Sequence, residues 1–349
     1  MREPLSRYVR SYARSFVRLI GSGLVALWLA ACTATLPPAT TPQPAASPAG
    51  FPVTIDNCGL TISYPAPPTR AVTMNQAATE IMLSLGLGDH MVGTAYLDDA
   101  ILPELEEAYQ AIPVLADEYP SQEVLLVAEP DFVYGAYRSA FGDEAAGPRE
   151  RLLELGIRSY LSVASCEDPA LRPERVTFET VYDEIRDIGR IFGASDRAEA
   201  LVAAMQARLD QVAAANGQET EPLRVFWFDS GDDEPFAGAC CGAPNMILEA
   251  AGAQNIFADA SGSWATVSWE EVIARDPQAI VVIDAEWSPA QEKIELLRSN
   301  PAYATITAVQ QERFVVLPFS ATTLGVRNAQ AVVDLAQGLY PDRFAAHGE

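Results

Sequence analysis

The stretch SDRAEALVAAMQARLDQVAAANG, residues 195–217, predicts one long, uninterrupted helix. Ser195 is the expected N-cap, and Asn216-Gly217 supplies the stop. Four apolar residues fall on one face at helical spacing: Leu201, Met205, Leu209 and Val212. A helix of this length spans about 30 Å, the width of a small domain. Strand and helix patterns lie on both sides of it, so it is either a spine between two α/β lobes or a crossover helix within one large sheet; we favour the spine.

Residues 1–31 predict a signal peptide, because five arginines precede an apolar run that starts at Leu19. The run ends in Leu29-Ala30-Ala31-Cys32, which resembles the bacterial lipobox, whose cysteine is lipidated and becomes the new N-terminus. Residues 32–50 contain five prolines and no charge, as expected of an extended tether. We therefore expect an exported protein on the outer face of the bacterial cytoplasmic membrane, attached only through its lipid.

Composition excludes several classes of site and partner. The net charge of −24 disfavours nucleic acid as a partner. The chain has one lysine, Lys293, and two histidines, His90 and His347, so histidine-rich metal sites are largely excluded. The roughly 300 residues after the tether suit two lobes.

Export places the cysteines in an oxidising compartment. With Cys32 reserved for lipid, four cysteines remain. Cys58 and Cys166 both precede the spine, and we expect them to form a disulfide within the first lobe. Three interpretations stay open for the adjacent Cys240 and Cys241: free thiols, a vicinal disulfide, or soft metal ligands.

Short β-rich runs alternate with amphipathic helices on both sides of the spine, which predicts mostly parallel sheets covered by helices. The expected organisation is a first lobe at 51–176, connecting helices at 177–217 and a second lobe at 222–346. The first lobe begins with a β-hairpin around Asn57-Cys58-Gly59. The fold class is thus α/β, with two Rossmann-like lobes on one long helix and a ligand cleft between their facing loops.

No sequence motif of an enzyme is present: G-x-S-x-G, a Walker A loop, H-E-x-x-H and C-x-x-C are all missing. Ser230-Gly231-Asp232-Asp233 follows a predicted strand but has no neighbouring base. We therefore expect no catalysis and no cofactor, and keep a cell-surface hydrolase as the competing class.

Four segments, taken together, resemble the substrate-binding proteins of ABC importers for siderophores, cobalamin and haem. They are ATEIMLSLGLGDHMVGTA (78–95), SQEVLLVAEPDFVYG (121–135), ILEAAGAQNIFAD (247–259) and VSWEEVIARDPQAIVVI (267–283). The resemblance implies a bilobal protein, expected to be a monomer, that passes its ligand to a permease dimer driven by a cytoplasmic ATPase. It also implies that Glu123 and Glu270, one on each lobe, dock onto permease arginines.

The resemblance further implies a pocket with Tyr96, Trp264 and Arg327. Tyr134 and Tyr137 follow another strand and would join them, because aromatic faces and one cation suit a flat or anionic ligand. We expect a ferric siderophore, with cobalamin or haem next, and a bare metal ion on carboxylates and the cysteine pair as a further alternative. Three acidic pairs either form a rim that suits a cationic or metal-bearing ligand or are simply solvated: Asp98-Asp99, Asp117-Glu118 and Asp233-Glu234.

Overall fold

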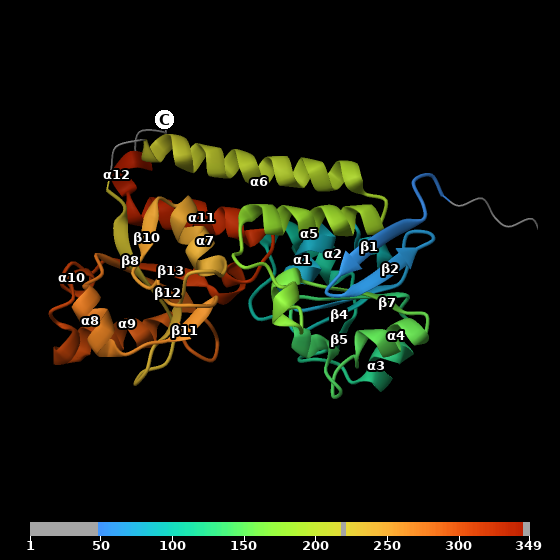
Figure 1. Ribbon diagram of the computed structural model, residues 1–349, viewed down its shortest axis with the longest axis horizontal. Helices are drawn as coiled ribbons and strands as arrows, with labels where there is room; N and C mark the ends of the chain where they lie inside the picture. The colour runs from blue at the N-terminus through green and yellow to red at the C-terminus, as the bar shows by residue number, and fades with distance from the viewer. Residues whose placement is uncertain (1–47, 218–220, 345–349) are drawn as a thin grey trace, which may run out of the picture. The chain divides into compact units, whose positions relative to one another are not determined.

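The first lobe is built on a five-stranded parallel sheet in the order β5-β4-β3-β6-β7. The computed structural model describes residues 48–217 and 221–344, and Figure 1 shows their elements. The strands are β3 (Ala71–Met74), β4 (Met91–Ala95), β5 (Val114–Ala116), β6 (Phe132–Gly135) and β7 (Arg158–Leu161). The helices are α1 (Gln76–Ser84), α2 (Glu106–Gln110), α3 (Gln122–Val127) and α4 (Arg149–Glu154).

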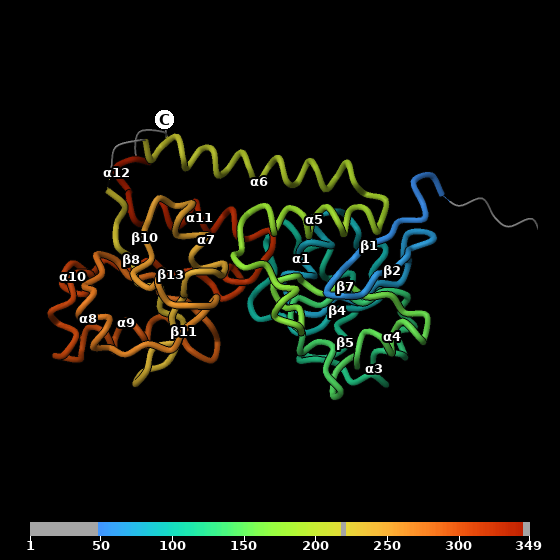
Figure 2. The backbone as a smooth tube through the Cα atoms, viewed as in Figure 1, coloured from blue at the N-terminus to red at the C-terminus, as the bar shows by residue number. Residues whose placement is uncertain are grey.

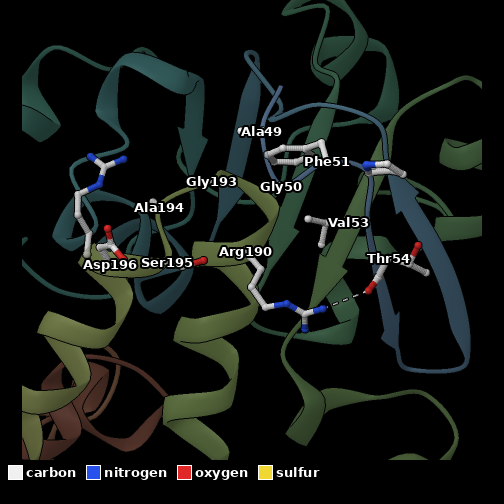
Figure 3. A pocket seen from close by; sticks show the side chains of 12 residues that line it. Ala49, Gly50, Phe51, Val53, Thr54, Arg190, Gly193, Ala194, Ser195 and Asp196 are labelled. Atoms are coloured by element: carbon white, nitrogen blue, oxygen red, sulfur yellow. Dashed lines mark hydrogen bonds between the residues drawn. The ribbon is translucent and has the colours of Figure 1, made fainter. Parts of the chain in front are cut away.

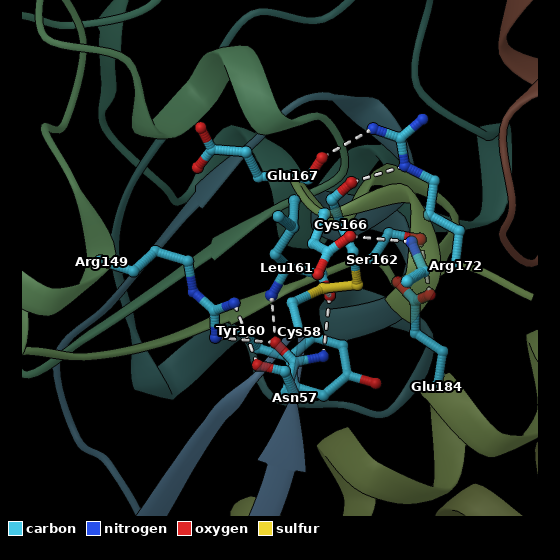
Figure 4. The surroundings of a disulfide bond; sticks show 12 residues. Asn57, Cys58, Arg149, Tyr160, Leu161, Ser162, Cys166, Glu167, Arg172 and Glu184 are labelled. Atoms are coloured by element: carbon cyan, nitrogen blue, oxygen red, sulfur yellow. Dashed lines mark hydrogen bonds between the residues drawn. A yellow bond between two sulfur atoms is a disulfide. The ribbon is translucent and has the colours of Figure 1, made fainter.

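A β-hairpin, β1 (Val53–Asn57) and β2 (Leu60–Tyr64), precedes this sheet. Its two turn residues, Cys58 and Gly59, have φ values of 51° and 84°, as a type I′ hairpin turn requires. The predicted Cys58–Cys166 disulfide is present and ties the turn to the segment after β7 (Figure 4). The Asn57 amide also exchanges two hydrogen bonds of 2.9 Å with the backbone of Leu161.

The second lobe is built around β8 (Leu223–Ser230), which pairs with three other strands. Its parallel part consists of β8, β10 (Ala253–Asn255), β12 (Ala279–Asp284) and β13 (Phe314–Pro318). Its antiparallel extension consists of β9 (Phe236–Gly238) and β11 (Trp264–Thr266). The helices are α7 (Ala243–Ala250), α8 (Trp269–Arg275), α9 (Ala290–Ser299), α10 (Thr307–Gln310), α11 (Arg327–Leu339) and α12 (Pro341–Phe344).

The long helix α6 (Ser195–Asn216) connects the two lobes, as predicted. It packs against α5 (Phe178–Ile191) of the first lobe and against α11 of the second, and the backbone in Figure 2 passes along both. The predicted N-cap is wrong: Ala194 is the N-cap, and Ser195 is the first helical residue. On the expected apolar face, Met205 and Val212 are buried.

One cluster of buried apolar side chains runs from the first lobe through α5 and α6 into the second. Val181, Met205 and Leu335 belong to it, from α5, α6 and α11. The joint between the lobes is therefore packed like a core. Within the two described ranges, no helix is both long enough and apolar enough to span a membrane. The predicted signal peptide, Cys32 and residues 33–47 of the tether lie outside those ranges.

Candidate functional site

A cavity of about 530 Å³ lies between the lobes, within the size range of small-molecule sites. Tyr137 and Ser162 reach it from the carboxyl ends of β6 and β7, and Asp229 and Phe319 from those of β8 and β13. Parallel α/β sheets bind ligands at this edge, because loops and helix starts converge there. The remaining lining includes Arg172, Phe236, Gly242 and Trp264. We call this cavity the interlobe cleft.

Four aromatic residues contribute to the wall of the interlobe cleft: Tyr137, Phe236, Trp264 and Phe319. Trp264 on β11 stacks on Phe236 on β9, with ring centroids 5.4 Å apart and planes 12° apart. Phe319 packs edge-on against Trp287, which is 59% exposed. Two of the aromatic residues predicted from sequence, Tyr137 and Trp264, therefore line the cleft. Such surfaces suit the apolar faces of an organic ligand.

Two charged residues complete the lining, and neither was predicted from sequence. Arg172 follows a short 3₁₀ turn at Pro169–Leu171, where no periodic pattern marks it. Asp229 lies at the carboxyl end of strand β8. Ligands of parallel α/β sheets bind at this end of the strands, so the sequence could have identified Asp229 as a candidate. Burial raises the pKa of the Asp229 carboxyl above its ordinary value, although the Ser230 hydroxyl and the Lys293 ammonium oppose the shift.

Polar contacts join the lobes beside the cleft. The hydroxyls of Tyr137 and Thr323 are 2.5 Å apart, and the Ser320 N–H donates to the Asp99 carboxylate at 2.7 Å. The Arg175 guanidinium also pairs with Glu249. Burial raises the pKa of Tyr137 still further above neutral pH, although the hydrogen bond with Thr323 opposes the shift.

Arg327 takes a different place from the one expected. Its guanidinium makes a two-pronged ion pair with Glu80 of α1, at 2.8 and 2.5 Å, and donates to the Ala100 carbonyl at 2.7 Å. Only 13% of the Arg327 side chain and 1% of the Glu80 side chain are exposed. Arg327 thus does not line the interlobe cleft, because its hydrogen-bonding groups are directed at the first lobe.

Tyr134 and Tyr96 do not line the interlobe cleft either. Tyr134 is fully buried, and its hydroxyl donates to the Glu184 carboxylate at 2.5 Å. Its position on a strand covered on both faces turns the ring to α5 rather than to the cleft. Tyr96 follows β4 in a left-handed conformation, φ 58°, and its ring packs edge-on against Tyr119 at 4.6 Å.

The two predicted docking residues are both exposed in the first turn of a helix. Glu123 follows the N-cap Ser121 of α3, and Glu270 follows the N-cap Ser268 of α8. Each N-cap side chain accepts a backbone N–H of its own helix. Neither glutamate takes part in an ion pair within the described residues.

The acidic pairs differ in their surroundings. Asp117, Glu118, Asp233 and Glu234 are exposed, and none of them lines the interlobe cleft. Asp98 is half-buried, and burial together with the neighbouring Asp99 raises its pKa to about 6. The two exposed pairs fit solvated acids better than parts of a continuous rim.

Cys240 and Cys241 form a disulfide with each other, the second of the three interpretations left open. The bonded pair precedes Gly242, which lines the cleft. The Cys241 carbonyl accepts a hydrogen bond of 2.8 Å from the N–H of Val176, which precedes α5 and also lines the cleft. Within residues 48–217 and 221–344, no group of three or more His, Cys, Asp or Glu side chains is placed to hold a metal ion.

A larger hollow, about 630 Å³, lies where the start of the described chain meets the corner between α5 and α6 (Figure 3). Residues 49–54 form one side, and Arg190, Gly193 and Ser195 lie on the other. The Arg190 guanidinium reaches the Thr54 carbonyl at 3.5 Å. No strand end or aromatic cluster of the second lobe contributes, so we place the ligand site at the interlobe cleft.

Known proteins are similar to this chain in sequence and in fold. The chain is 28% identical over 298 residues to an uncharacterized ABC transporter substrate-binding lipoprotein, YvrC, of Bacillus subtilis, covering 84% of this chain and 87% of that one. It is 29% identical over 221 residues to the vitamin B12-binding protein of Salmonella typhimurium, covering 63% and 73%. A solved structure from Saccharomonospora viridis, described as an ABC-type Fe3+-hydroxamate transport system, has a TM-score of 0.69 at 26% identity, covering 83% and 99%.

The family model described as periplasmic binding protein matches residues 72–321, most of both lobes and the whole of α6. Such proteins serve transport, which favours transport over the hydrolase that the sequence left as a competing class. The bilobal α/β fold, the single connecting helix and this match together confirm the resemblance: the chain belongs to the periplasmic binding protein family of ABC-transporter substrate-binding proteins.

Proposed function

We propose that this protein captures a metal chelate in the interlobe cleft and delivers it to an ABC importer, with a ferric siderophore as the first choice of ligand. The observation that carries the proposal is the cleft itself: aromatic rings and two opposite charges, contributed by both lobes, line one cavity of about 530 Å³. Large organic chelates offer apolar faces and polar edges to such a wall. Relatives named for vitamin B12 and for Fe3+-hydroxamate support the ligand class and keep cobalamin as the second choice.

A bare metal ion fits less well. The described residues hold no cluster of three metal-ligating side chains, and Cys240 and Cys241 are bonded to each other rather than available as thiolates. A chelate brings its own ligands to the metal, so the protein needs only to recognise the organic periphery.

The ligand is identified by native mass spectrometry of the protein isolated from its own host, coupled to a metal scan. An organic ligand that contains iron supports the first choice, and cobalt redirects it to corrinoids. A bare ion with no organic mass contradicts the chelate proposal.

We also propose that Glu123 and Glu270 dock the protein onto the permease. They lie on different lobes, at the starts of α3 and α8, and both are exposed. Around Glu123, α3 exposes 43% of Val124 and 80% of Val127, an apolar surface that a partner would cover. Two fixed charges on separate lobes would set the register on a permease dimer.

The test combines Glu123→Arg and Glu270→Arg in one protein. Charge reversal places like charges at the docking face, so uptake of the chelate is expected to be lost while ligand affinity in solution stays unchanged. Glu107→Arg with Glu292→Arg is the matched control, since these glutamates are exposed on α2 and α9. Wild-type uptake by the docking variant would show that the two glutamates do not dock.

A further inference from the structure

We propose that Asp229 and Arg172 select the ligand: Asp229 accepts a hydrogen bond from an N–H or O–H group of the chelate, and Arg172 donates to one of its oxygens. The interlobe cleft is then specific for chelates whose periphery carries both hydrogen-bond donors and oxygen acceptors. Amide N–H groups or an ammonium group would supply the donors. This inference rests on the proposed function and adds the chemical class of the ligand to it.

Asp229 has an unmet hydrogen-bonding atom at the cleft. Its Oδ2 accepts from the Ser230 hydroxyl at 3.0 Å. Its Oδ1 is buried and has no hydrogen-bond partner within the described residues. A buried acceptor without a partner is costly, and a donor supplied by the ligand would remove that cost. Asp229 lines the cavity, so a bound ligand would lie beside this carboxylate.

The backbone of Asp229 is fixed from behind by the only lysine of the chain. The Lys293 ammonium donates to the Asp229 carbonyl at 2.7 Å, to the Ser288 carbonyl at 2.6 Å and to the Ser288 hydroxyl at 3.0 Å. Lys293 is 2% exposed, and these three acceptors use all three of its protons. The carboxylate therefore stands on a strand end held in one position, as a selective contact requires.

Arg172 presents a donor from the first lobe. Its Nε and Nη2 donate to the carbonyls of Cys166 and Glu167, at 2.5 and 3.1 Å (Figure 4). No hydrogen bond within the described residues uses Nη1, which leaves donor capacity on a guanidinium that lines the cleft. The Cys58–Cys166 disulfide anchors the same loop, so the position of this cation is fixed as well.

The two charges make opposite demands on the ligand. A chelate whose periphery carries only carboxylates satisfies Arg172 but brings a like charge to Asp229 in a partly desolvated cavity, where repulsion is strong. An amide-rich or ammonium-bearing chelate satisfies both. The cleft is therefore expected to discriminate against carboxylate-only complexes such as haemin and ferric citrate.

The experiment titrates the purified chain with four probes and follows tryptophan fluorescence, since Trp264 lines the cleft. Ferrioxamine B and cyanocobalamin carry amide donors, and ferrioxamine B also carries an ammonium; haemin and ferric citrate carry carboxylates. The variants are Asp229→Ala, Asp229→Asn and Arg172→Gln. Asp233→Asn and Arg208→Gln are charge-matched controls at exposed positions outside the cleft. Thermal unfolding of each variant checks that it is folded, and Asp229→Asn replaces Asp229→Ala if the latter is not.

The wild type is expected to bind a donor-bearing probe more tightly than either carboxylate probe. Loss of a charge-assisted hydrogen bond at Asp229 or Arg172 should weaken that binding about 10- to 100-fold, with the controls unchanged. Tighter binding of haemin or ferric citrate, or unchanged affinity of the folded Asp229 variant for the bound donor probe, overturns the inference and leaves the proposed function standing. Binding of none of the four overturns the proposed ligand class, and the inference with it.

Discussion

Glu184 shows what burial does to a single carboxyl group in this protein. It lies on α5, is 2% exposed, and accepts hydrogen bonds from the hydroxyls of Tyr134 at 2.5 Å and Ser162 at 2.7 Å. Burial raises its pKa to about 7, although both donors act to lower it. Since Ser162 lines the interlobe cleft, this carboxyl supports the cleft wall from within the first lobe.

We predict that Glu184 makes the protein less stable as the pH rises from about 4.5 to about 7. In this window the folded state binds a proton that the unfolded state has already lost, so the free energy of unfolding falls with rising pH. The loss is complete above the folded-state pKa and amounts to about 3 kcal/mol at most. Asp98, with its pKa near 6, acts in the same direction.

Glu184→Gln removes this titration, because the amide is neutral at every pH. Urea denaturation at pH 5 and pH 8 should show a smaller drop in stability for the variant than for the wild type. The exposed Glu107→Gln serves as the control and should follow the wild type. If the stability of Glu184→Gln falls between pH 5 and pH 8 as much as that of the wild type, the pH dependence comes from other groups.

The sequence predicted the position of Tyr134 along the chain but not the direction of its ring. Strand β6 is buried on both faces, so it lacks the alternation of polar and apolar residues that tells one face from the other. Tyr137 was predicted because it follows a strand that ends at the cleft, and Trp264 was predicted from the family resemblance. Arg172 was missed because it sits in an irregular segment without any periodic signal.

Helices and strands were predictable where their pattern is long. The long helix predicted at 195–217 is present as α6, and the hairpin predicted around Asn57-Cys58-Gly59 is present as β1 and β2. Strands β5, β9, β10 and β11 have three residues each, too few for any period to show in the sequence. Their pairing is decided by neighbours distant in the sequence.

The crossing of α5 and α6 depends on a glycine. A Cβ atom at Gly189 would lie 2.6 Å from the Cβ of Ala198, closer than two carbons can pack. We predict that Gly189→Ala destabilises the protein by about 1–3 kcal/mol, because overcrowding at the crossing outweighs the gain of up to about 1 kcal/mol in helix propensity. Urea denaturation measures the difference.

The control for this element is the double variant Gly189→Ala with Ala198→Gly. It moves the methyl group from α6 to α5 and should recover most of the lost stability. A stabilising Gly189→Ala, or a double variant no more stable than the single, would show that the two helices adjust without cost.

At the scale of the whole molecule, the Glu80–Arg327 ion pair links α1 of the first lobe to α11 of the second across 247 residues of sequence. The resemblance placed an arginine here but gave no partner for it, because nothing local in the sequence connects the two positions. We predict that Arg327→Leu lowers stability by about 3–5 kcal/mol, since it leaves Glu80 buried without its counter-charge.

Glu80→Leu combined with Arg327→Leu should restore most of that loss, because replacing both partners removes the unpaired charge. Urea denaturation follows stability, and titration with the identified chelate should show unchanged affinity in the double variant. A strong loss of affinity for the chelate would show that Arg327 contributes to ligand binding after all.

The single passage of the chain through α6 also sets an order of folding. Every strand of the first sheet, and both Cys58 and Cys166, precede residue 195, and the second sheet begins only at Leu223. A chain made from its N-terminus can complete the first lobe and close its disulfide before the second lobe exists. The interlobe cleft is then the last feature to form. Its first-lobe wall, which includes Tyr137 and Arg172, is complete before the second-lobe residues that form the opposite wall are made.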